Sequence, residues 1–529
     1  MRKKTILTII LILAMFTCFG CQRQEAKHKE QDLVHVKSSK GEQTKKVIYV
    51  MVDSLMAQAI DRGIQQKELP TFKFLIDNGQ YHKDLVSSFP TMSVTIDSSL
   101  ITGVYPDHHR VPGLVWYSAD DKKVINYSVG PKEAIQQGVD PFLFDALVNL
   151  NGKHLNQHQP TIFEDLSRKG LKAGSINGLI YRGLKEHTLS IPPWIEVPTS
   201  LPKEIQVKGP DYMALGSLTN PLEGTKKLPD GVTRRIGINN QFSLETANYL
   251  ITENKLPDFL YVYLPDLDQK LHKHGPSELK GVKEVDNQLH SLLQSFGSPE
   301  EALNKAVFII SGDSGMTQIL SEPENSKIDL PSFFKDYEIL RTGETATDDT
   351  EVAFAVNETM AYVYKLNTDK SLRDMAHLLT ADPRIDFVSW NEKGWIHAVK
   401  GDPAKEVLYK AGGKLVDPYK QNWTVKQNSN VLDLTIDTSN RTLKYGQYPD
   451  ALRRLSGALH SHAGEFLVVT AKPGYELADR SSTTHAGGGG HGSLHQQESL
   501  IPLIICGTDQ KPEYLRIVDL KSFILKLVR

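Results

Sequence analysis

Continuous apolar runs that end in acidic residues are the feature that most constrains the fold of this chain. Residues 47–52 read VIYVMV and are followed directly by Asp53. Such a run is typical of a strand buried on both faces. Similar runs lie at 259–264, 306–310, 466–469 and 500–505. With helical stretches between them, they predict an α/β fold with a mostly parallel central sheet and helices on both faces.

Acids and histidines follow several of these predicted strands. Asp268 and His272 come after the run at 259–264, Asp313 comes after 306–310, and His491 precedes the last run. Taken singly, each has an ordinary interpretation as a solvated loop residue or a helix cap. Ligands of open α/β sheets bind beyond the carboxyl ends of the strands, so the shared position favours a common site. Imidazole and carboxylate together suit zinc or a similar transition metal.

Three alternating hydroxyls, Thr91, Ser93 and Thr95, precede or open a predicted helix. A hydroxyl at a helix N-terminus is commonly an N-cap. The functional interpretation is a nucleophile activated by a metal, with backbone N–H groups facing an anion.

The N-terminus reads as a secretory leader. A basic start at 2–4 precedes an apolar run at 5–16, which is too short for a transmembrane span. Gly20 and Cys21 resemble the cleavage and lipidation site of a bacterial lipoprotein, although Cys18 stands where Leu is usual. Plain secretion and an uncleaved anchor are the alternatives. We expect a signal peptide at 1–20, a lipidated Cys21, and a solvated tether to residue 45 that holds the protein on the extracytoplasmic side of the cell membrane.

Short alternating segments interrupt the strand–helix rhythm between 345 and 440. They predict a small α+β insertion that caps the site, within a catalytic domain formed by 46–344 and 441–529.

Lys and Arg number 61 and Asp and Glu 63, a formal charge of −2. This balance argues against a protein that works by wrapping duplex nucleic acid.

These motifs together resemble the type I phosphodiesterase/nucleotide pyrophosphatase branch of the alkaline phosphatase superfamily. The resemblance is carried by five segments, at 50–54, 89–112, 263–276, 309–316 and 490–507. It implies an alkaline phosphatase-like fold and two zinc-like ions that flank a phosphorylated Ser or Thr, acting on a small phosphorylated substrate. By position, the nucleophile is Ser93. The implied ligands of one ion are Asp53, Asp313 and the Ser93 oxygen, and those of the other are Asp268, His272 and His491.

Two departures from the family pattern touch this site. Ser314 stands where the family has a metal-binding histidine, and Ile96 stands where it has a phosphate-binding asparagine. An oxygen-rich site at Asp53 and Asp313 favours Mg²⁺ or Mn²⁺ over zinc, unless another residue such as His485 supplies the missing imidazole.

The sequence therefore predicts a metal-dependent phosphoric ester hydrolase at the outer cell surface that works through a phosphorylated Ser93. The alternative is a surface binding protein that keeps the fold with weakened catalysis. A sulfatase is disfavoured because the Pro and Arg of its motif are absent after Ser93. A membrane phosphoethanolamine transferase is disfavoured because only the leader is apolar enough to enter a bilayer.

Overall fold

A seven-stranded sheet forms the centre of the first part of the molecule. The computed structural model describes residues 45–127, 143–193 and 201–528. In spatial order the sheet contains β2 (Gly79–Val86), β24 (Leu500–Cys506), β10 (Ala306–Ser311), β1 (Lys46–Val52), β9 (Phe259–Leu264), β5 (Ala173–Ile176) and β8 (Tyr212–Ala214). The five strands from β10 to β8 are parallel, whereas β24 runs antiparallel to both β10 and β2. The predicted mostly parallel sheet is thus confirmed.

Helices cover both faces of this sheet because successive side chains of a buried strand point to opposite sides. In β1, Ile48, Val50 and Val52 pack into one core, and Val47, Tyr49 and Met51 pack into the other. The first core is closed by α3 (Ala57–Gln65), α4 (Pro70–Asp77), α11 (Asn240–Thr252), α12 (Asp266–His274), α13 (Lys280–Gln294) and α14 (Pro299–Lys305). The second is closed by α5 (Ser93–Thr102), α9 (Ile162–Arg168) and α19 (Leu520–Leu527).

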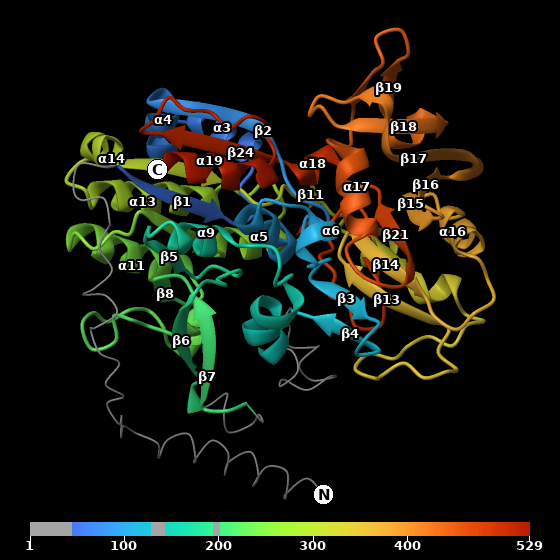
Figure 1. Cartoon of the computed structure of the whole chain (residues 1–529), viewed down its shortest axis with the longest axis horizontal. Coiled ribbons are helices and arrows are strands. Elements are labelled where there is room, and N and C mark those ends of the chain that lie inside the picture. The colour runs from blue at the N-terminus through green and yellow to red at the C-terminus, as the bar shows by residue number, and fades with distance from the viewer. Residues whose placement is uncertain (1–44, 128–142, 194–200, 529) are drawn as a thin grey trace, which may run out of the picture.

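A second sheet of nine strands lies beside the first part, on the right in Figure 1. Its order is β13 (Val352–Asn357), β14 (Met360–Lys365), β21 (Glu465–Ala471), β15 (Ile385–Glu392), β16 (Trp395–Lys400), β17 (Asp402–Val416), β20 (Thr442–Tyr445) and β19 (Leu434–Asp437), with β18 (Asn422–Gln427) paired to β17. Helix α16 (Leu372–Thr380) packs on one face and α17 (Ala451–Leu459) on the other. The expectation that 466–469 forms a strand of the central sheet was wrong, because β21 lies between β14 and β15 of the second sheet. The second sheet thus includes two strands beyond the predicted insertion at 345–440, β20 and β21, while the division of the chain into domains stays a prediction.

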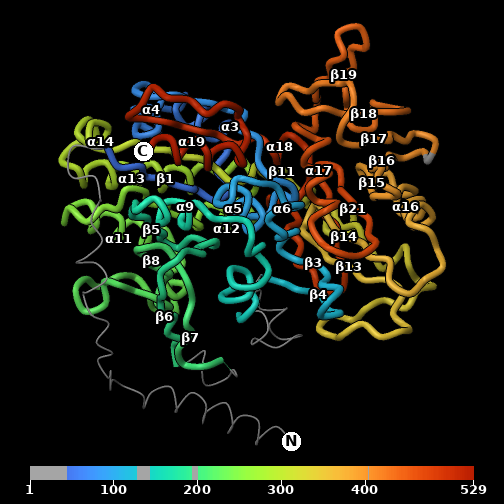
Figure 2. The backbone as a smooth tube through the Cα atoms, in the orientation of Figure 1, coloured from blue at the N-terminus to red at the C-terminus, as the bar shows by residue number. Residues whose placement is uncertain are grey.

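The two parts are joined by short two-stranded ladders and by α6 (Pro106–His109). The hairpin of β3 (Val115–Ser118) and β4 (Lys123–Asn126) contacts β13 and β14, where Leu114 N–H donates to Asn357 Oδ1 at 2.8 Å and Tyr117 N–H donates to Tyr364 Oη at 3.0 Å. The other pairs are β11 (Thr317–Gln318) with β23 (Gly489–Gly490) and β12 (Lys327–Asp329) with β22 (Glu476–Ala478), whereas β6 (Lys185–Ser190) and β7 (Glu204–Gly209) pair beside β8, away from the second sheet (Figure 1). The continuous tube in Figure 2 shows that segments distant in sequence meet at this junction.

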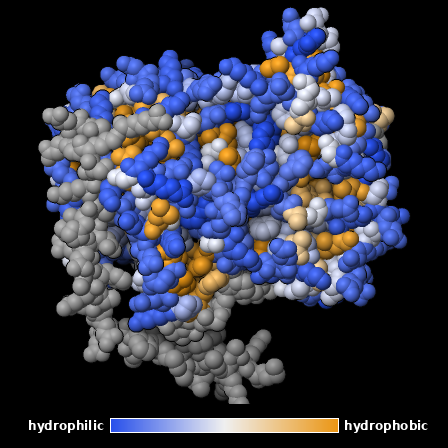
Figure 3. Space-filling model, in the orientation of Figure 1, coloured by the Kyte–Doolittle hydropathy of each residue, from blue (hydrophilic) through white to orange (hydrophobic). Residues whose placement is uncertain are grey.

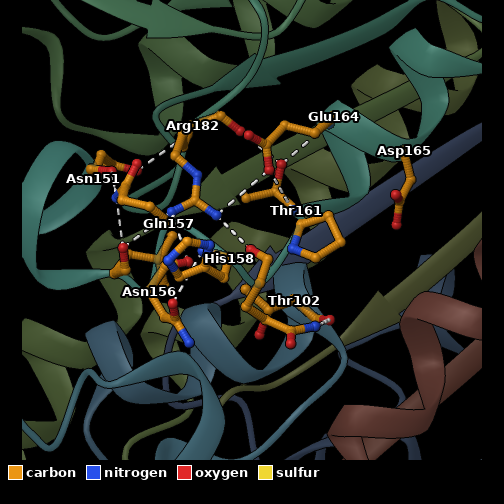
Figure 4. A network of polar contacts seen from close by, with 12 residues as sticks. Thr102, Asn151, Asn156, Gln157, His158, Thr161, Glu164, Asp165 and Arg182 are labelled. Atoms are coloured by element: carbon orange, nitrogen blue, oxygen red, sulfur yellow. Dashed lines mark hydrogen bonds and ion pairs between the residues drawn. The ribbon is translucent and has the colours of Figure 1, made fainter.

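The loop that enters α9 is held by the buried guanidinium of Arg182 (Figure 4). Its Nη1 donates to the carbonyl of Leu155 at 3.1 Å, and its Nη2 lies 3.4 Å from Glu164 Oε2. Thr161 and Glu164 also form a capping box at the start of α9. We assign this network a structural role, because the Arg182 guanidinium donates to backbone carbonyls and pairs with Glu164 within the fold.

The surface is mixed in polarity. On the face shown in Figure 3, apolar side chains reach the surface in separate patches among hydrophilic ones. In the part of the chain that the structure describes, no helix has the length and apolarity needed to cross a bilayer. The predicted leader, Cys21 and tether up to residue 44 lie outside the described residues.

Candidate active site

Three neighbouring parallel strands bring three aspartates together. Strand β1 lies between β10 and β9, with Met51 opposite Ser311 and Val52 opposite Leu264. The strands therefore end level with one another. Asp53 follows β1 directly, Asp313 follows β10, and Asp268 lies in the first turn of α12 after β9. The sequence-based expectation that these acids share one edge of the sheet is met by this geometry.

Ser54 forms hydrogen bonds with both Asp313 and Asp268. Its backbone N–H donates to Asp313 Oδ1 at 2.8 Å, and its hydroxyl donates to Asp268 Oδ1 at 2.8 Å. Its φ of 57° lies in the left-handed region, which is uncommon for a residue other than glycine. Such strain is found mainly where surrounding contacts hold a functional geometry.

Two histidines face Asp268. His272 lies one helical turn later in α12, with Nε2 at 3.2 Å from Asp268 Oδ1, and His491 Nε2 lies 3.6 Å from the same oxygen. His272 Nδ1 lies 2.9 Å from the carbonyl of Gly489, and His491 Nδ1 lies 2.6 Å from the carbonyl of Thr91. Carbonyls only accept, so each Nδ1 carries a proton, and Nε2, which faces Asp268, is the ring nitrogen left to bind a metal. Metal-binding histidines are oriented in this way.

The glycine run before His491 allows the chain to pass directly against α12. A Cβ at Gly488 would lie 1.8 Å from the carbonyl oxygen of His272, and one at Gly489 would lie 2.2 Å from Met316 Sδ. Strand β23 then pairs with β11, with Gly490 opposite Thr317, which fixes the position of His491. The run is thus required by packing at the site.

The carboxylates of Asp53 and Asp313 have few hydrogen-bond donors around them. Asp53 Oδ2 accepts from the Tyr263 hydroxyl, while the buried Asp313 Oδ2 has no hydrogen-bond partner among the described residues. Burial, together with the charges of Asp313 and Asp268, raises the pKa of Asp53 well above its usual range. At Asp268 burial acts in the same direction, but His272 and His491 outweigh it and hold the pKa well below its usual range. An orphaned carboxylate oxygen beside other acids fits a divalent cation at Asp53 and Asp313.

Only one of the three alternating hydroxyls faces these acids. Ser93 is the first residue of α5, and its Oγ lies 3.5 Å from Asp53 Oδ1. Thr91 Oγ1 is buried and accepts from Gly492 N–H at 2.8 Å, and buried Thr95 Oγ1 donates to the carbonyl of Val111 at 3.3 Å. No side chain caps the start of α5, so its first N–H groups lie beside Ser93.

The sequence matches the type I phosphodiesterase / nucleotide pyrophosphatase family over residues 47–494. The chain belongs to this family. It is accordingly a phosphoric ester hydrolase by class, and the family's members are metal-dependent phosphoesterases. No curated protein sequence is significantly similar to the chain.

Solved structures of two related kinds share the fold. Murine ectonucleotide pyrophosphatase/phosphodiesterase 5, as an inactive variant in complex with AMP, has a TM-score of 0.53 and 14% identity, over 92% of this chain and 95% of that chain. Phosphonoacetate hydrolase from Sinorhizobium meliloti 1021, in complex with phosphonoacetate, has a TM-score of 0.55 and 14% identity, over 92% of this chain and 97% of that chain. At this identity the likeness concerns the fold, which is that of the alkaline phosphatase superfamily.

The structure explains where the two departures from the family pattern lie. Ile96 lies on the buried side of α5 and packs into the core between this helix and the central sheet. Ser314 is also buried, and its Oγ lies 3.3 Å from the hydroxyl of Ser54. His485 groups with His272 and Glu358. Its role as a substitute for the missing imidazole at Asp53 and Asp313 stays a prediction.

Two further residues at the site escaped the sequence analysis. Glu358 accepts from the backbone N–H of His491 at 3.0 Å, and its Oε1 lies 3.7 Å from His272 Nε2. Glu358 comes from the turn between β13 and β14 in the second sheet, so no local pattern connects it to the ligands. Tyr263, the donor to Asp53, lies within an apolar run and reads as a core residue. Its place near the end of that run was the only signal.

A cavity of about 670 Å³ opens beside these groups, within the range of small-molecule sites. Its wall includes Met92, which precedes the nucleophile candidate, and Glu358 and His485 beside the histidines. Apolar side chains of the β3–β4 hairpin and of β13 line it together with Arg341 and Arg480. Met92, Glu358 and His485 are thus the lining residues that lie next to the groups of the candidate site.

Proposed function

We propose that the protein hydrolyses a small phosphoric ester by covalent catalysis at Ser93, with two divalent cations held by its acids and histidines. The observation that carries the proposal is the Ser93 hydroxyl at the uncapped start of α5, 3.5 Å from Asp53 Oδ1. Asp53, Asp313 and the Ser93 oxygen are the ligands of one cation, and Asp268, His272 and His491 are those of the other. Bound cations supply charge neutralisation of the phosphoryl group and a lower pKa for the attacking hydroxyl.

In the proposed reaction the Ser93 Oγ forms a bond to phosphorus while the bond from phosphorus to the leaving-group oxygen breaks. The leaving-group oxygen takes the electron pair of that bond and, overall, the proton that Ser93 loses. Asp53 Oδ1 orients the hydroxyl, and Tyr263 holds the other oxygen of Asp53 in place. The N–H groups at the start of α5 face the phosphoryl oxygens, as helix N-termini do toward anions. Water then attacks phosphorus, which releases phosphate or a phosphomonoester and restores Ser93.

The two cation positions differ in chemistry. Asp268, His272 and His491 provide two imidazoles and one carboxylate, a set that suits zinc. Asp53 and Asp313 provide oxygen only, and Ser314 adds a hydroxyl where an imidazole would favour zinc. We propose zinc at the first position and Mn²⁺ or Mg²⁺ at the second.

Ser93→Ala is the decisive variant, and Thr95→Ala is the matched control on the same helix. We expect Ser93→Ala to reduce the turnover of p-nitrophenyl phosphate mono- and diesters at least about a thousandfold, with the melting temperature retained. Full turnover in Ser93→Ala would exclude it as the nucleophile. A wild-type protein that binds both metals but turns over no phosphate ester, nucleotide or phosphonate would favour the binding-protein alternative.

We also propose that the protein is anchored at the outer face of the cell membrane through a lipid on Cys21. The proposal is supported by the basic and apolar leader and the Gly20–Cys21 pair, followed by a polar tether. Two acyl chains provide stable anchoring where one does not.

A further inference from the structure

Glu358 reaches from the second sheet into the histidine cluster of the candidate active site. It occupies the turn between β13 and β14 with a φ of 57°, in the left-handed region. Its carbonyl accepts from Leu477 N–H at 2.8 Å, and its carboxylate contacts the His491 N–H and lies 3.7 Å from His272 Nε2. The backbone strain is thus held by contacts that direct a carboxylate between imidazoles.

His485 lies against His272, with 4.3 Å between the ring centroids. Its Nδ1 lies 2.8 Å from Glu476 Oε1, and its backbone N–H donates to Glu476 Oε2 at 2.6 Å. The Glu476 side chain is almost fully buried. A carboxylate only accepts, so Nδ1 carries a proton, and it also lies 4.0 Å from Glu358 Oε2. Nε2 is then the ring nitrogen left to bind a metal, as in histidines that bind metals with a carboxylate behind them.

We propose that His272, Glu358 and His485 form an outer cation position, next to the inner position formed by Asp268, His272 and His491. One ligand atom from each of the three residues lies within 4.8 Å of the other two. Two imidazoles and one carboxylate favour a transition metal such as Zn²⁺ or Co²⁺ over Mg²⁺ or Ca²⁺. Glu358 and His485 also line the cavity, so the outer position faces the route by which ions arrive.

The two positions share one nitrogen. His272 donates through Nδ1 to the carbonyl of Gly489, so Nε2 is its single donor to a metal. An ion in the outer position therefore competes with an ion in the inner position for that lone pair. An incoming ion can exchange Glu358 and His485 for Asp268 and His491 while it stays bound to His272. The outer position thus acts as the entry point of the inner ion.

The test removes the inner position and asks whether the outer one still binds metal. In the full chain with Asp268→Ala and His491→Ala, all three outer ligands remain. We expect equilibrium dialysis and visible absorption to show bound Co²⁺ whose affinity falls at least about a hundredfold when His485→Ala is added. His158→Ala is the matched control, because His158 is exposed and distant in sequence from the outer ligands, and it should leave the affinity unchanged.

Equal Co²⁺ affinity with and without His485→Ala would overturn the outer position. If that variant fails to fold, as judged by its melting temperature, Glu358→Gln in the same background replaces it, with an expected loss of about tenfold or more. In the otherwise unmodified chain, His485→Ala should slow Co²⁺ uptake by the metal-free protein, and an unchanged uptake rate would overturn the entry role. The proposal shares His272 with the proposed function, but these readouts need no turnover, so failure of ester hydrolysis leaves them unaffected.

Discussion

Asp97 is a fully buried carboxyl on α5, one helical turn after Ser93, and we predict that it lowers stability at neutral pH. The Tyr261 hydroxyl donates to its Oδ1 at 2.8 Å. Burial raises the pKa of Asp97 to about 8, with the charge of Asp313 adding to the effect and the Tyr261 hydrogen bond opposing it. In the unfolded chain an aspartate has a pKa of about 3.9. The native state therefore binds one more proton than the unfolded state between these two values.

The sign and size of the effect follow from proton linkage. Because the folded-state pKa is the higher one, the contribution of Asp97 to stability is greatest below about pH 4 and falls as the pH rises to about 8. One pKa unit corresponds to about 1.4 kcal/mol, so at pH 7 the loss is about 4 kcal/mol. Asp97→Asn keeps an oxygen for the Tyr261 hydroxyl and cannot ionise, so it removes this pH-dependent loss.

The assay is thermal unfolding of wild type and Asp97→Asn at pH 5 and pH 8, with a chelator present so that metal binding does not contribute. We expect the variant to melt several degrees higher at pH 8, and the difference to be much smaller at pH 5. The control is Asp84→Asn, at an exposed aspartate of β2, which should change stability by no more than about 0.5 kcal/mol. A difference between wild type and Asp97→Asn that is the same at both pH values would refute the reasoning.

Three further outcomes are expected. Ser314→His should bind a second zinc ion tightly enough to keep it through dialysis, whereas wild type loses that ion. Ser54→Gly is combined with it, because glycine makes room beside residue 314 and adopts the left-handed φ without strain. Equal metal content of the two proteins by elemental analysis would contradict this. Although burial opposes it, Glu358 and Asp268 raise the pKa of His272 to about 9, so Co²⁺ affinity at the inner position should fall at least about tenfold per pH unit below pH 9. A flat profile in a binding titration would be inconsistent with a histidine ligand. Mass spectrometry should find the mature N-terminus at a lipidated Cys21, and a Cys21→Ser protein that stays membrane-bound would exclude lipid anchoring.

The central sheet could be predicted from the sequence because its strands are buried on both faces and read as unbroken apolar runs. The six predicted site residues meet in the structure because three of them follow adjacent parallel strands. The second sheet was harder, since β21 has the same apolar run as a central strand and only pairing distinguishes them. Glu358 could not be found, because its position depends on how a hairpin turn of one sheet lies against the ligands of another.

The position of Glu358 also changes what the second sheet does for the enzyme. A cap that only shapes the cavity would contact the substrate and leave the metal ligands to the central sheet. Here the turn between β13 and β14 supplies a carboxylate to the histidine cluster, and the neighbouring Asn357 accepts hydrogen bonds from Leu114 and Val115 at the start of the β3–β4 hairpin. Cation binding and docking of the second sheet therefore use the same few residues. We therefore expect cation affinity to depend on how the second sheet packs against the β3–β4 hairpin. A substitution that weakens the hydrogen bonds of Asn357 should weaken cation binding as well.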